Sequence, residues 1–274
     1  MLNTHLYPAF GRMFLSAITS DDVQKFMLGY ASLSKSLVDK IMMTLRQIFN
    51  AAVDDEHLTR SPMNKVRPPE GTTGERIPLT LSQAAELLTQ AREHKYGLLP
   101  ILMLYTGLRR GEALGLRWED IRDDHINVMR AVTFEQNKRS VVGETKTDAG
   151  LRRVPLLPEL ADALGKRGTG YVFGGENVLP PTTFKRHWDA LQTDIPVLQG
   201  VSPHKLRHTY LMLLRRAGVD GATQQYLMGH ADYETTANVY THIDGADIAD
   251  ARTKMATMLP DLLPKLLPKL LPQA

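Results

Sequence analysis

Residues 204–242 read HKLRHTYLMLLRRAGVDGATQQYLMGHADYETTANVYTH, and their pattern is helical almost throughout. Apolar residues recur at helical spacing, which predicts a helix that Pro203 opens and Gly218 closes. A second helix is predicted from about Gln224 to Met228, because Gly229 breaks the pattern there. Turns therefore bring the polar residues of this stretch together, rather than one continuous helix surface.

Four of these polar residues have side chains suited to catalysis. They are His204, Arg207, His230 and Tyr240, the last on a third short helix that Asp232 is expected to cap. Any one of them alone is typical of a helical core with satisfied polar groups. Two imidazoles, a guanidinium and a phenol in one stretch indicate a reactive site instead.

The segments HKLRHT, LMGH and TTANVYTH resemble the carboxy-terminal signature of the tyrosine recombinases, the phage-integrase family. They lie in the family's order and at compatible spacings. The resemblance implies that His204, Arg207 and His230 are catalytic and that Tyr240 is the nucleophile.

Residues 106–121, TGLRRGEALGLRWEDI, resemble the family's first arginine box. This resemblance makes Arg109 catalytic and Glu112 its accompanying acidic residue. The preceding run YGLLPILMLYTG is apolar on most sides, which predicts a buried helix ending at Gly107. An arginine at the edge of a buried helix needs an anion, because it keeps its proton. A phosphate is favoured, and an internal salt bridge to Glu112 or Asp120 is the alternative.

Composition sets broad limits on the function. The 274 residues contain 33 Lys and Arg against 30 Asp and Glu, and the net charge of +3 permits a nucleic-acid partner without requiring one. The absence of Cys excludes disulfides, thiolate metal sites and Cys nucleophiles. No apolar run is long enough to span a bilayer, and no signal-peptide pattern is present. We expect a cytoplasmic, DNA-associated protein of bacterial or phage origin without a membrane partner.

The first seventy residues predict a small helical unit. Ser20 is the predicted N-cap of one helix, and a second helix is predicted from about Ser36 to Asp55. Lys35, Lys40 and Arg46 are candidate DNA-binding residues, although a solvated helix face explains each of them equally well.

Residues 1–66 resemble only the later part of the helical, SAM-like core-binding domain of integrases, whose first helix is expected upstream. We therefore expect Phe26, Met42 and Phe49 to lack part of their cover. We also expect this amino-terminal truncation to impair DNA cleavage. Residues 67–78 are rich in Pro, Gly and Thr and are the predicted interdomain linker.

Residues 79–259 form the predicted catalytic domain, which is mainly α with a small antiparallel β-sheet. The sheet is predicted for residues 125–155, where the sequence alternates and is rich in Val, Ile and Thr. Composition alone makes Lys146 a solvated charge at a hairpin tip. The resemblance implies instead that Lys146 reaches the active site, with Lys138 as the alternative.

Several further elements of this domain are predicted from local patterns. Thr80 and Gln83 predict a capping box at the start of a helix. Helices are also predicted at about residues 159–166 and 182–192, with YVFG as a short strand between them. Trp188 is expected to be a core residue.

The carboxy-terminal end combines a helix and a repeat. Family members pass a carboxy-terminal helix to a neighbouring protomer, and residues 244–259 could form it. The resemblance therefore implies a tetramer on double-stranded DNA, with an accessory DNA-bending or directionality protein as a further partner. Residues 260–274 form a Leu/Pro/Lys repeat whose prolines prevent a regular helix. This tail is expected to be disordered, and a reading-frame change is the alternative origin.

The predicted reaction is site-specific DNA recombination. Arginine forks suit the non-bridging oxygens of a phosphodiester without a metal ion. Attack by Tyr240 would give a 3′-phosphotyrosine bond that conserves the energy of the phosphodiester, so no cofactor is expected. Lys146 would protonate the leaving 5′-oxygen, and His204 and His230 would assist by hydrogen bonding or proton transfer.

Other tyrosines and other enzyme classes are alternatives to a recombinase that uses Tyr240. Tyr210 is expected to be a packed aromatic, and Tyr226 and Tyr233 fit helix faces. A metal nuclease is disfavoured because the acidic residues are scattered. Two other functions stay open: an integrase remnant that binds DNA without recombining it, and a type IB topoisomerase-like enzyme. Strand exchange measured beside supercoil relaxation would separate them.

Overall fold

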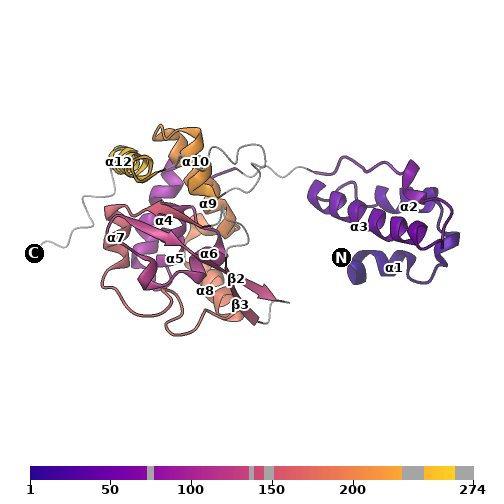
Figure 1. Cartoon of the computed structure of the whole chain (residues 1–274), viewed down its shortest axis with the longest axis horizontal. Coiled ribbons are helices and arrows are strands. Elements are labelled where there is room, and N and C mark those ends of the chain that lie inside the picture. Colours follow the sequence, from indigo (N-terminus) through magenta and orange to yellow (C-terminus); the bar gives the residue numbers. More distant parts are fainter. Residues whose placement is uncertain (73–76, 136–138, 145–150, 230–243, 263–274) are drawn as a thin grey trace, which may run out of the picture. The chain divides into compact units, whose positions relative to one another are not determined.

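The computed structural model describes residues 1–72, 77–135, 139–144, 151–229 and 244–262. The chain divides into two compact units, Met1–Glu75 and Arg76–Ala274 (Figure 1). Each unit has a hydrophobic core of its own, and the two cores have no residue in common.

The first unit is helical. Its elements are η1 (Leu2–Leu6), α1 (Tyr7–Phe10), η2 (Leu15–Ala17), α2 (Ser20–Leu28), α3 (Lys35–Asp54) and η3 (Pro62–Lys65). Val23 and Met27 of α2 pack against Ile41, Leu45 and Phe49 of α3, all of them buried. The apolar stripes that predicted these two helices therefore meet in one core.

Two expectations for this unit are wrong. The N-cap of α2 is Thr19 and not Ser20, because the Thr19 hydroxyl accepts from the backbone N–H of Asp22 at 3.2 Å and completes a capping box. Met42 and Phe49 do not lack cover: they are 4% and 2% exposed. Phe26 is half-buried, and its ring packs 4.9 Å from that of Phe10.

Part of the predicted linker is bound to the first unit. The side chain of Gln24 donates to the carbonyl of Arg67 at 3.1 Å and accepts from its N–H at 2.9 Å. The N–H of Thr72 donates to the carbonyl of Leu33 at 2.8 Å, and the N–H of Lys35 donates to the carbonyl of Thr72 at 2.9 Å. Arg67 and Thr72, at the two ends of this stretch, are therefore hydrogen-bonded to the first unit, Arg67 through a side chain and Thr72 through backbone groups.

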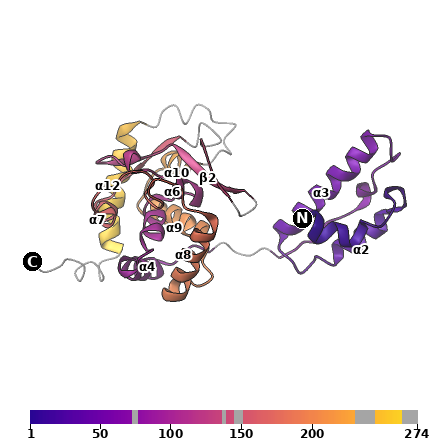
Figure 2. The same cartoon turned by 90° about the horizontal axis from the view of Figure 1, so that it is seen from below.

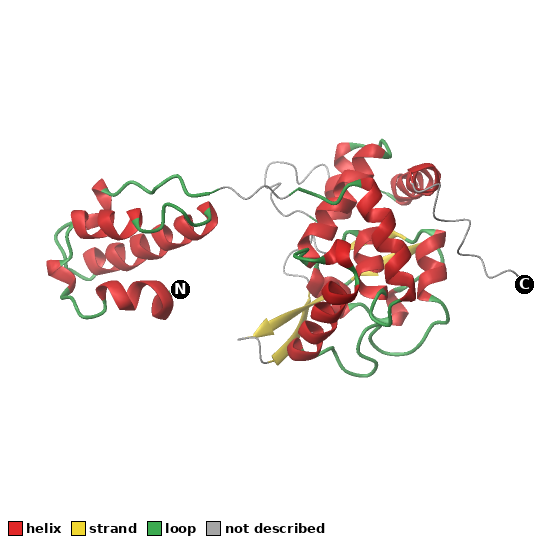
Figure 3. Ribbon diagram, turned by 180° about the vertical axis from the view of Figure 1, so that it is seen from behind, coloured by secondary structure: helices red, strands yellow, loops and turns green. Residues whose placement is uncertain are grey.

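The second unit is mainly α with small antiparallel strand pairs, which confirms the predicted fold class (Figure 3). Its helices are α4 (Leu81–Glu93), α5 (Leu98–Thr106), α6 (Arg110–Gly115), η4 (Trp118–Asp120), α7 (Pro158–Leu164), α8 (Pro181–Asp194), η6 (Pro196–Leu198), α9 (Pro203–Arg216), α10 (Gly221–Met228) and α12 (Gly245–Leu262). Thr80 and Gln83 form the predicted capping box of α4, and Trp188 is buried as expected.

The strands form two separate pairs instead of one sheet. β1 (His125–Val128) pairs with β4 (Arg152–Pro155), and β2 (Arg130–Glu135) pairs with β3 (Arg139–Glu144). The predicted strand at YVFG is absent from the described chain, where Tyr171 makes only isolated bridges to Arg117 and Gly175. The β2–β3 hairpin packs on α6, and β4 contacts α10 and α12.

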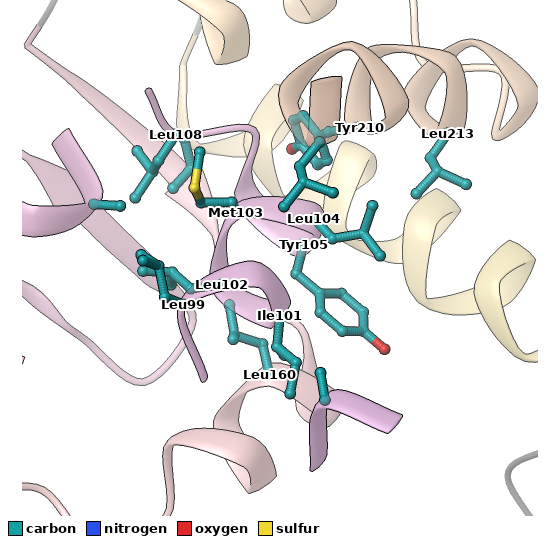
Figure 4. Close-up of a cluster of buried hydrophobic side chains, with 14 of the residues drawn as sticks. Leu99, Ile101, Leu102, Met103, Leu104, Tyr105, Leu108, Leu160, Tyr210 and Leu213 are labelled. Atoms are coloured by element: carbon teal, nitrogen blue, oxygen red, sulfur yellow. The ribbon is translucent and has the colours of Figure 1, made fainter. Parts of the chain in front are cut away.

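Helix α5 is the centre of the second core (Figure 4). Every residue from Leu99 to Thr106 is buried, and the helix packs against α9 through Tyr210 and Leu213. Gly107 ends α5 with φ of 64°, and an added Cβ there would lie 2.2 Å from Cδ1 of Tyr210. Only glycine fits both the left-handed backbone and this close approach. The turn at Gly107 then directs the chain toward Arg109.

Helix α12 lies on the side of its own unit, in contact with β4, α9 and α10 (Figure 2). Ala251 and Met255 are buried in the core, and Nε of Arg252 donates to the carbonyl of Leu156 at 2.9 Å. Among the described residues, no helix combines the length and apolar character needed to cross a membrane.

Candidate active site

Glu112 is the centre of a buried charge cluster. It lies on the first turn of α6 and is 3% exposed. Its carboxylate accepts from the N–H and from Nη1 of Arg109, both at 2.8 Å. The same carboxylate accepts from Nη1 of Arg152 at 3.1 Å and from Nη2 of Arg152 at 2.8 Å. Burial alone would raise the pKa of Glu112, but Arg152 and Arg109 outweigh it and lower the pKa to about 2.

Arg207 joins this cluster from α9. Its side chain is 2% exposed, and its Nη1 lies 3.9 Å from Oε2 of Glu112. Nη1 donates to the carbonyl of Gly107 at 2.7 Å, and Nη2 donates to the carbonyl of Met228. Burial and the nearby charge of Arg109 lower the pKa of Arg207 to about 9, so the guanidinium keeps its charge near neutral pH.

The end of α10 accepts hydrogen bonds from all three arginines. Arg152 Nε donates to the carbonyl of Leu227 at 2.8 Å, and Arg207 donates to the next carbonyl, that of Met228. Arg109 Nη2 donates to the carbonyl of Gly229 at 2.6 Å. Three successive carbonyls at the negative end of a helix dipole are thereby matched to three guanidiniums. The cluster therefore holds the end of α10 in place.

Exposure distinguishes the three arginines. The side chain of Arg109 is 44% exposed, whereas those of Arg207 and Arg152 are 2% and 0% exposed. Arg109 therefore presents the open edge of the cluster to solvent. Its neighbour Arg110 faces elsewhere, with its guanidinium 4.6 Å from the ring centroid of Phe134 and 5.3 Å from that of Phe184. The structure thus separates the two adjacent arginines of the box.

His204 lies one helical turn before Arg207 on α9 and is exposed. Its ring meets that of His208 edge-on, with 4.6 Å between the centroids. An imidazole at the exposed start of α9, beside a buried guanidinium, is placed to contact a ligand that reaches the cluster from solvent. The structure therefore brings Arg207, Arg109 and Glu112 together, and His204 lies on the same helix as Arg207, three residues before it.

The remaining predicted site residues were Lys146, its alternative Lys138, His230 and Tyr240. All four lie outside the described residues. Of the two salt bridges open to Arg109, one is present in the structure. The salt bridge to Glu112 forms, whereas Asp120 pairs with Arg130, at 2.5 Å between the carboxylate and Nη1.

Arg152 is the residue that sequence reasoning missed. Its sequence context, LRRVPL, holds two adjacent arginines, and composition suggests that both are solvated. The alternation of the strand could have identified it, because residues two apart in a strand point to the same face. Val154 and Leu156 are buried, so Arg152 points inward with them while Arg153 is exposed.

Two competing tyrosines have other roles. Tyr210 is 1% exposed, and burial raises its pKa, which disfavours the phenolate that a nucleophile needs. It is a packed aromatic, as predicted. The hydroxyl of Tyr226 accepts from the N–H of Arg153 at 3.1 Å. No group of three or more His, Asp or Glu side chains suited to a metal ion occurs within the described parts of the chain.

The candidate DNA contacts of the first unit lie on α3, and all three are exposed. Lys35 pairs with Asp39 at 3.4 Å. With 3.6 residues per turn, Lys35 and Arg46 lie within about 20° of each other around the helix, and Lys40 lies about 140° from Lys35. The three residues therefore do not form one stripe.

Comparisons with known proteins agree with the predicted family. The sequence model described as "Phage integrase family" matches residues 78–246. A protein named tyrosine recombinase XerC-like from Caldanaerobacter subterraneus subsp. tengcongensis is 28% identical, over 88% of this chain and 70% of that protein. The ICEBs1 integrase of Bacillus subtilis is also 28% identical, over 89% of this chain and 72% of its own length.

A solved structure has the same fold. The Tn1549 transposon integrase, in complex with a circular intermediate DNA, aligns with a TM-score of 0.65 and 22% identity. The alignment covers 89% of this chain and 86% of the integrase chain.

Proposed function

The chain belongs to the phage integrase family, and from this premise we propose that its arginine cluster binds the scissile phosphate of duplex DNA for attack by Tyr240. Members of this family are tyrosine recombinases, and this chain is a DNA strand transferase that cuts and rejoins DNA. One observation carries the assignment of the site: Glu112 holds the half-exposed Arg109 beside the buried Arg207.

The charge of the cluster suits a phosphodiester. Three guanidiniums surround a single carboxylate within the described residues, which leaves an excess of positive charge. Charge neutralisation and positioning supply most of the catalysis in phosphoryl transfer. Arg109 is accessible to a phosphate as it stands. Arg207 donates to two carbonyls, and we propose that the phosphate takes the place of the Met228 carbonyl when DNA binds.

Covalent chemistry is assigned to residues 146, 230 and 240 by the family motif. The Tyr240 oxygen forms a bond to phosphorus while the bond from phosphorus to the 5′-oxygen breaks. A phenol has a pKa of about 10, and nearby cations lower it by favouring the phenolate. Lys146 gives its proton to the departing 5′-oxygen, and His204 and His230 hydrogen-bond to the phosphate or move protons. Attack by a 5′-hydroxyl reverses these steps, so no cofactor is consumed.

The assembly is part of the proposal. The DNA in the Tn1549 complex supports double-stranded DNA as the substrate, with Lys35, Lys40 and Arg46 as backbone contacts. We propose a cytoplasmic tetramer on DNA, in which α12 leaves β4 and docks on a neighbouring protomer. An accessory DNA-bending or directionality protein would act with this tetramer.

Substitution of the nucleophile tests the function. Tyr240→Phe should bind DNA like the unaltered chain and form no adduct that survives denaturant on a nicked suicide substrate, because only the attacking oxygen is removed. Tyr226→Phe is the matched control and should still form the adduct. An adduct with Tyr240→Phe would show that another residue is the nucleophile. A second assay distinguishes a recombinase from a topoisomerase-like enzyme. A recombinase should mainly exchange strands between two duplexes, whereas a topoisomerase-like enzyme should mainly relax supercoils.

A further inference from the structure

Arg152 makes contacts that no assigned catalytic step uses. It lies on β4 with no exposed side-chain surface, and the contacts of its guanidinium include two kinds of partner among the described residues. Nη1 and Nη2 take both oxygens of Glu112, at 3.1 and 2.8 Å. Nε donates to the carbonyl of Leu227 at 2.8 Å. The side chain therefore connects the start of α6 to the end of α10.

The geometry requires a guanidinium. A planar fork takes both carboxylate oxygens in parallel while the third N–H direction stays free for another acceptor. A lysine ammonium keeps the charge but cannot reproduce three fixed directions at once. A buried carboxylate also needs a close cation, because an unpaired buried charge costs several kcal/mol. Arg152 meets this need, and Arg109 remains available at the open edge of the cluster.

We propose that Arg152 is a positioning residue for DNA cleavage, acting through Glu112 on Arg109 and through Leu227 on the end of α10. This inference rests on the proposed function, in which Arg109 binds the phosphate. Glu112 accepts from both Arg109 and Arg152 on Oε1, so a fixed carboxylate fixes the direction of Arg109. Without Arg152, Glu112 is free to turn toward Arg207, 3.9 Å away, and competes with the phosphate for it.

Three measurements on four proteins test the inference. The proteins are the unaltered chain, Arg152→Lys, the double variant Glu112→Gln with Arg152→Met, and the matched control Arg153→Met. The measurements are urea unfolding, the Kd for duplex DNA, and single-turnover cleavage of a suicide substrate at saturating DNA. The double variant removes both charges together, so it leaves no unpaired carboxylate if Arg152→Lys fails to fold.

Arg152→Lys and the double variant should each bind DNA with a nearly unchanged Kd but cleave roughly 10- to 100-fold more slowly, the usual effect of a supporting contact. Arg153→Met should cleave at the unaltered rate, because its exposed side chain takes no part in the cluster. Unaltered cleavage by either Arg152-substituted protein that is folded overturns the inference. The inference is also overturned if the loss of cleavage is fully explained by the fraction of unfolded protein or by weaker DNA binding.

The same assay separates this inference from the proposed function. If the unaltered chain forms no adduct, or Tyr240→Phe still forms one, the proposed function fails and the role of Arg152 fails with it. If Tyr240→Phe alone abolishes the adduct while Arg152→Lys cleaves normally, the function holds and only the positioning role is overturned.

Discussion

Arg109 and Arg207 both donate to the end of α10. They should contribute differently to the free energy of unfolding, because only Arg207 is buried. Removal of Arg207 leaves the carbonyls of Gly107 and Met228 without their donor, at a cost of about 1–3 kcal/mol for each buried group. Arg207→Ala should therefore lower the free energy of unfolding markedly, and Arg109→Ala should lower it much less because that side chain is 44% exposed. Urea unfolding followed by tryptophan fluorescence measures both.

If each guanidinium stabilises the transition state, both substitutions should also raise the activation free energy of cleavage by several kcal/mol. The two effects are separable at low urea, where both variants are folded. Equal losses of DNA binding and cleavage would contradict a catalytic role and favour a purely structural one.

Glu112 makes the stability of the second unit depend on pH. Its pKa falls from 4.5 to about 2 on folding, so the folded state favours the carboxylate. The resulting stability is fully present above the unfolded value and is lost as pH falls from about 4.5 toward 2. Glu112→Gln should be less stable than the parent at pH 7, and the difference should shrink through this window. Urea unfolding at about pH 7, 4.5 and 3 measures this difference. A difference that stays constant across these values would contradict the linkage.

At this scale the sequence left Glu112 and Asp120 open as salt-bridge partners of Arg109 and favoured a phosphate over both. The structure pairs Arg109 with Glu112, three residues further on at the start of α6. The sequence did not predict the buried position of Arg152, which depends on the contact of β4 with α10 and on the pairing of Arg152 with Glu112 of α6. Arg152 and Glu112 are 40 residues apart in the sequence, so their contact has no local sequence pattern. The one local indication is that Arg152 alternates with Val154 and so points to the same face of the strand.

Among the elements, the turn after α5 requires glycine for two separate reasons. Gly107→Ala would put a non-glycine residue at φ of 64° and a methyl group 2.2 Å from the Tyr210 ring. The backbone cost is about 1–2 kcal/mol, and overpacking adds about 1–3 kcal/mol. We expect a large drop in Tm together with slower cleavage, since Arg109 follows this turn.

Gly218→Ala is the matched control for this substitution. Gly218 has φ of 71°, but an added Cβ there has no atom within 4 Å. It should show the backbone cost alone. If both variants lose the same stability, contact with Tyr210 contributes nothing and the close approach is not a constraint.

Local patterns predicted most helices of the chain but not their exact ends or the strand pairing. Thr80 and Gln83 leave one choice of N-cap, and the capping box was confirmed. Thr19 and Ser20 are adjacent hydroxyl residues, so either could be the N-cap of α2. Thr19 takes this position because Asp22 exchanges hydrogen bonds with it. Alternation identified strands in residues 125–155, but the pairing of β1 with β4 depends on where the hairpin between them packs.

The described residues form two separate hydrophobic cores, and this predicts two unfolding events. Phe49 belongs to the core of the first unit and Leu102 to that of the second, and both are buried. Trp118 and Trp188, the two tryptophans of the chain, lie in the second unit, so tryptophan fluorescence reports on that unit alone. Far-UV circular dichroism reports on the helices of both units.

Phe49→Ala should destabilise the first unit by about 3–5 kcal/mol through the cavity it leaves. It should move the circular-dichroism transition of that unit to lower urea and leave the fluorescence transition unchanged. Leu102→Ala should destabilise the second unit by about 2–5 kcal/mol and so move the fluorescence transition to lower urea. A fluorescence shift caused by Phe49→Ala would show that the units unfold as one cooperative body, because a change confined to the first core would then reach tryptophans that lie entirely in the second.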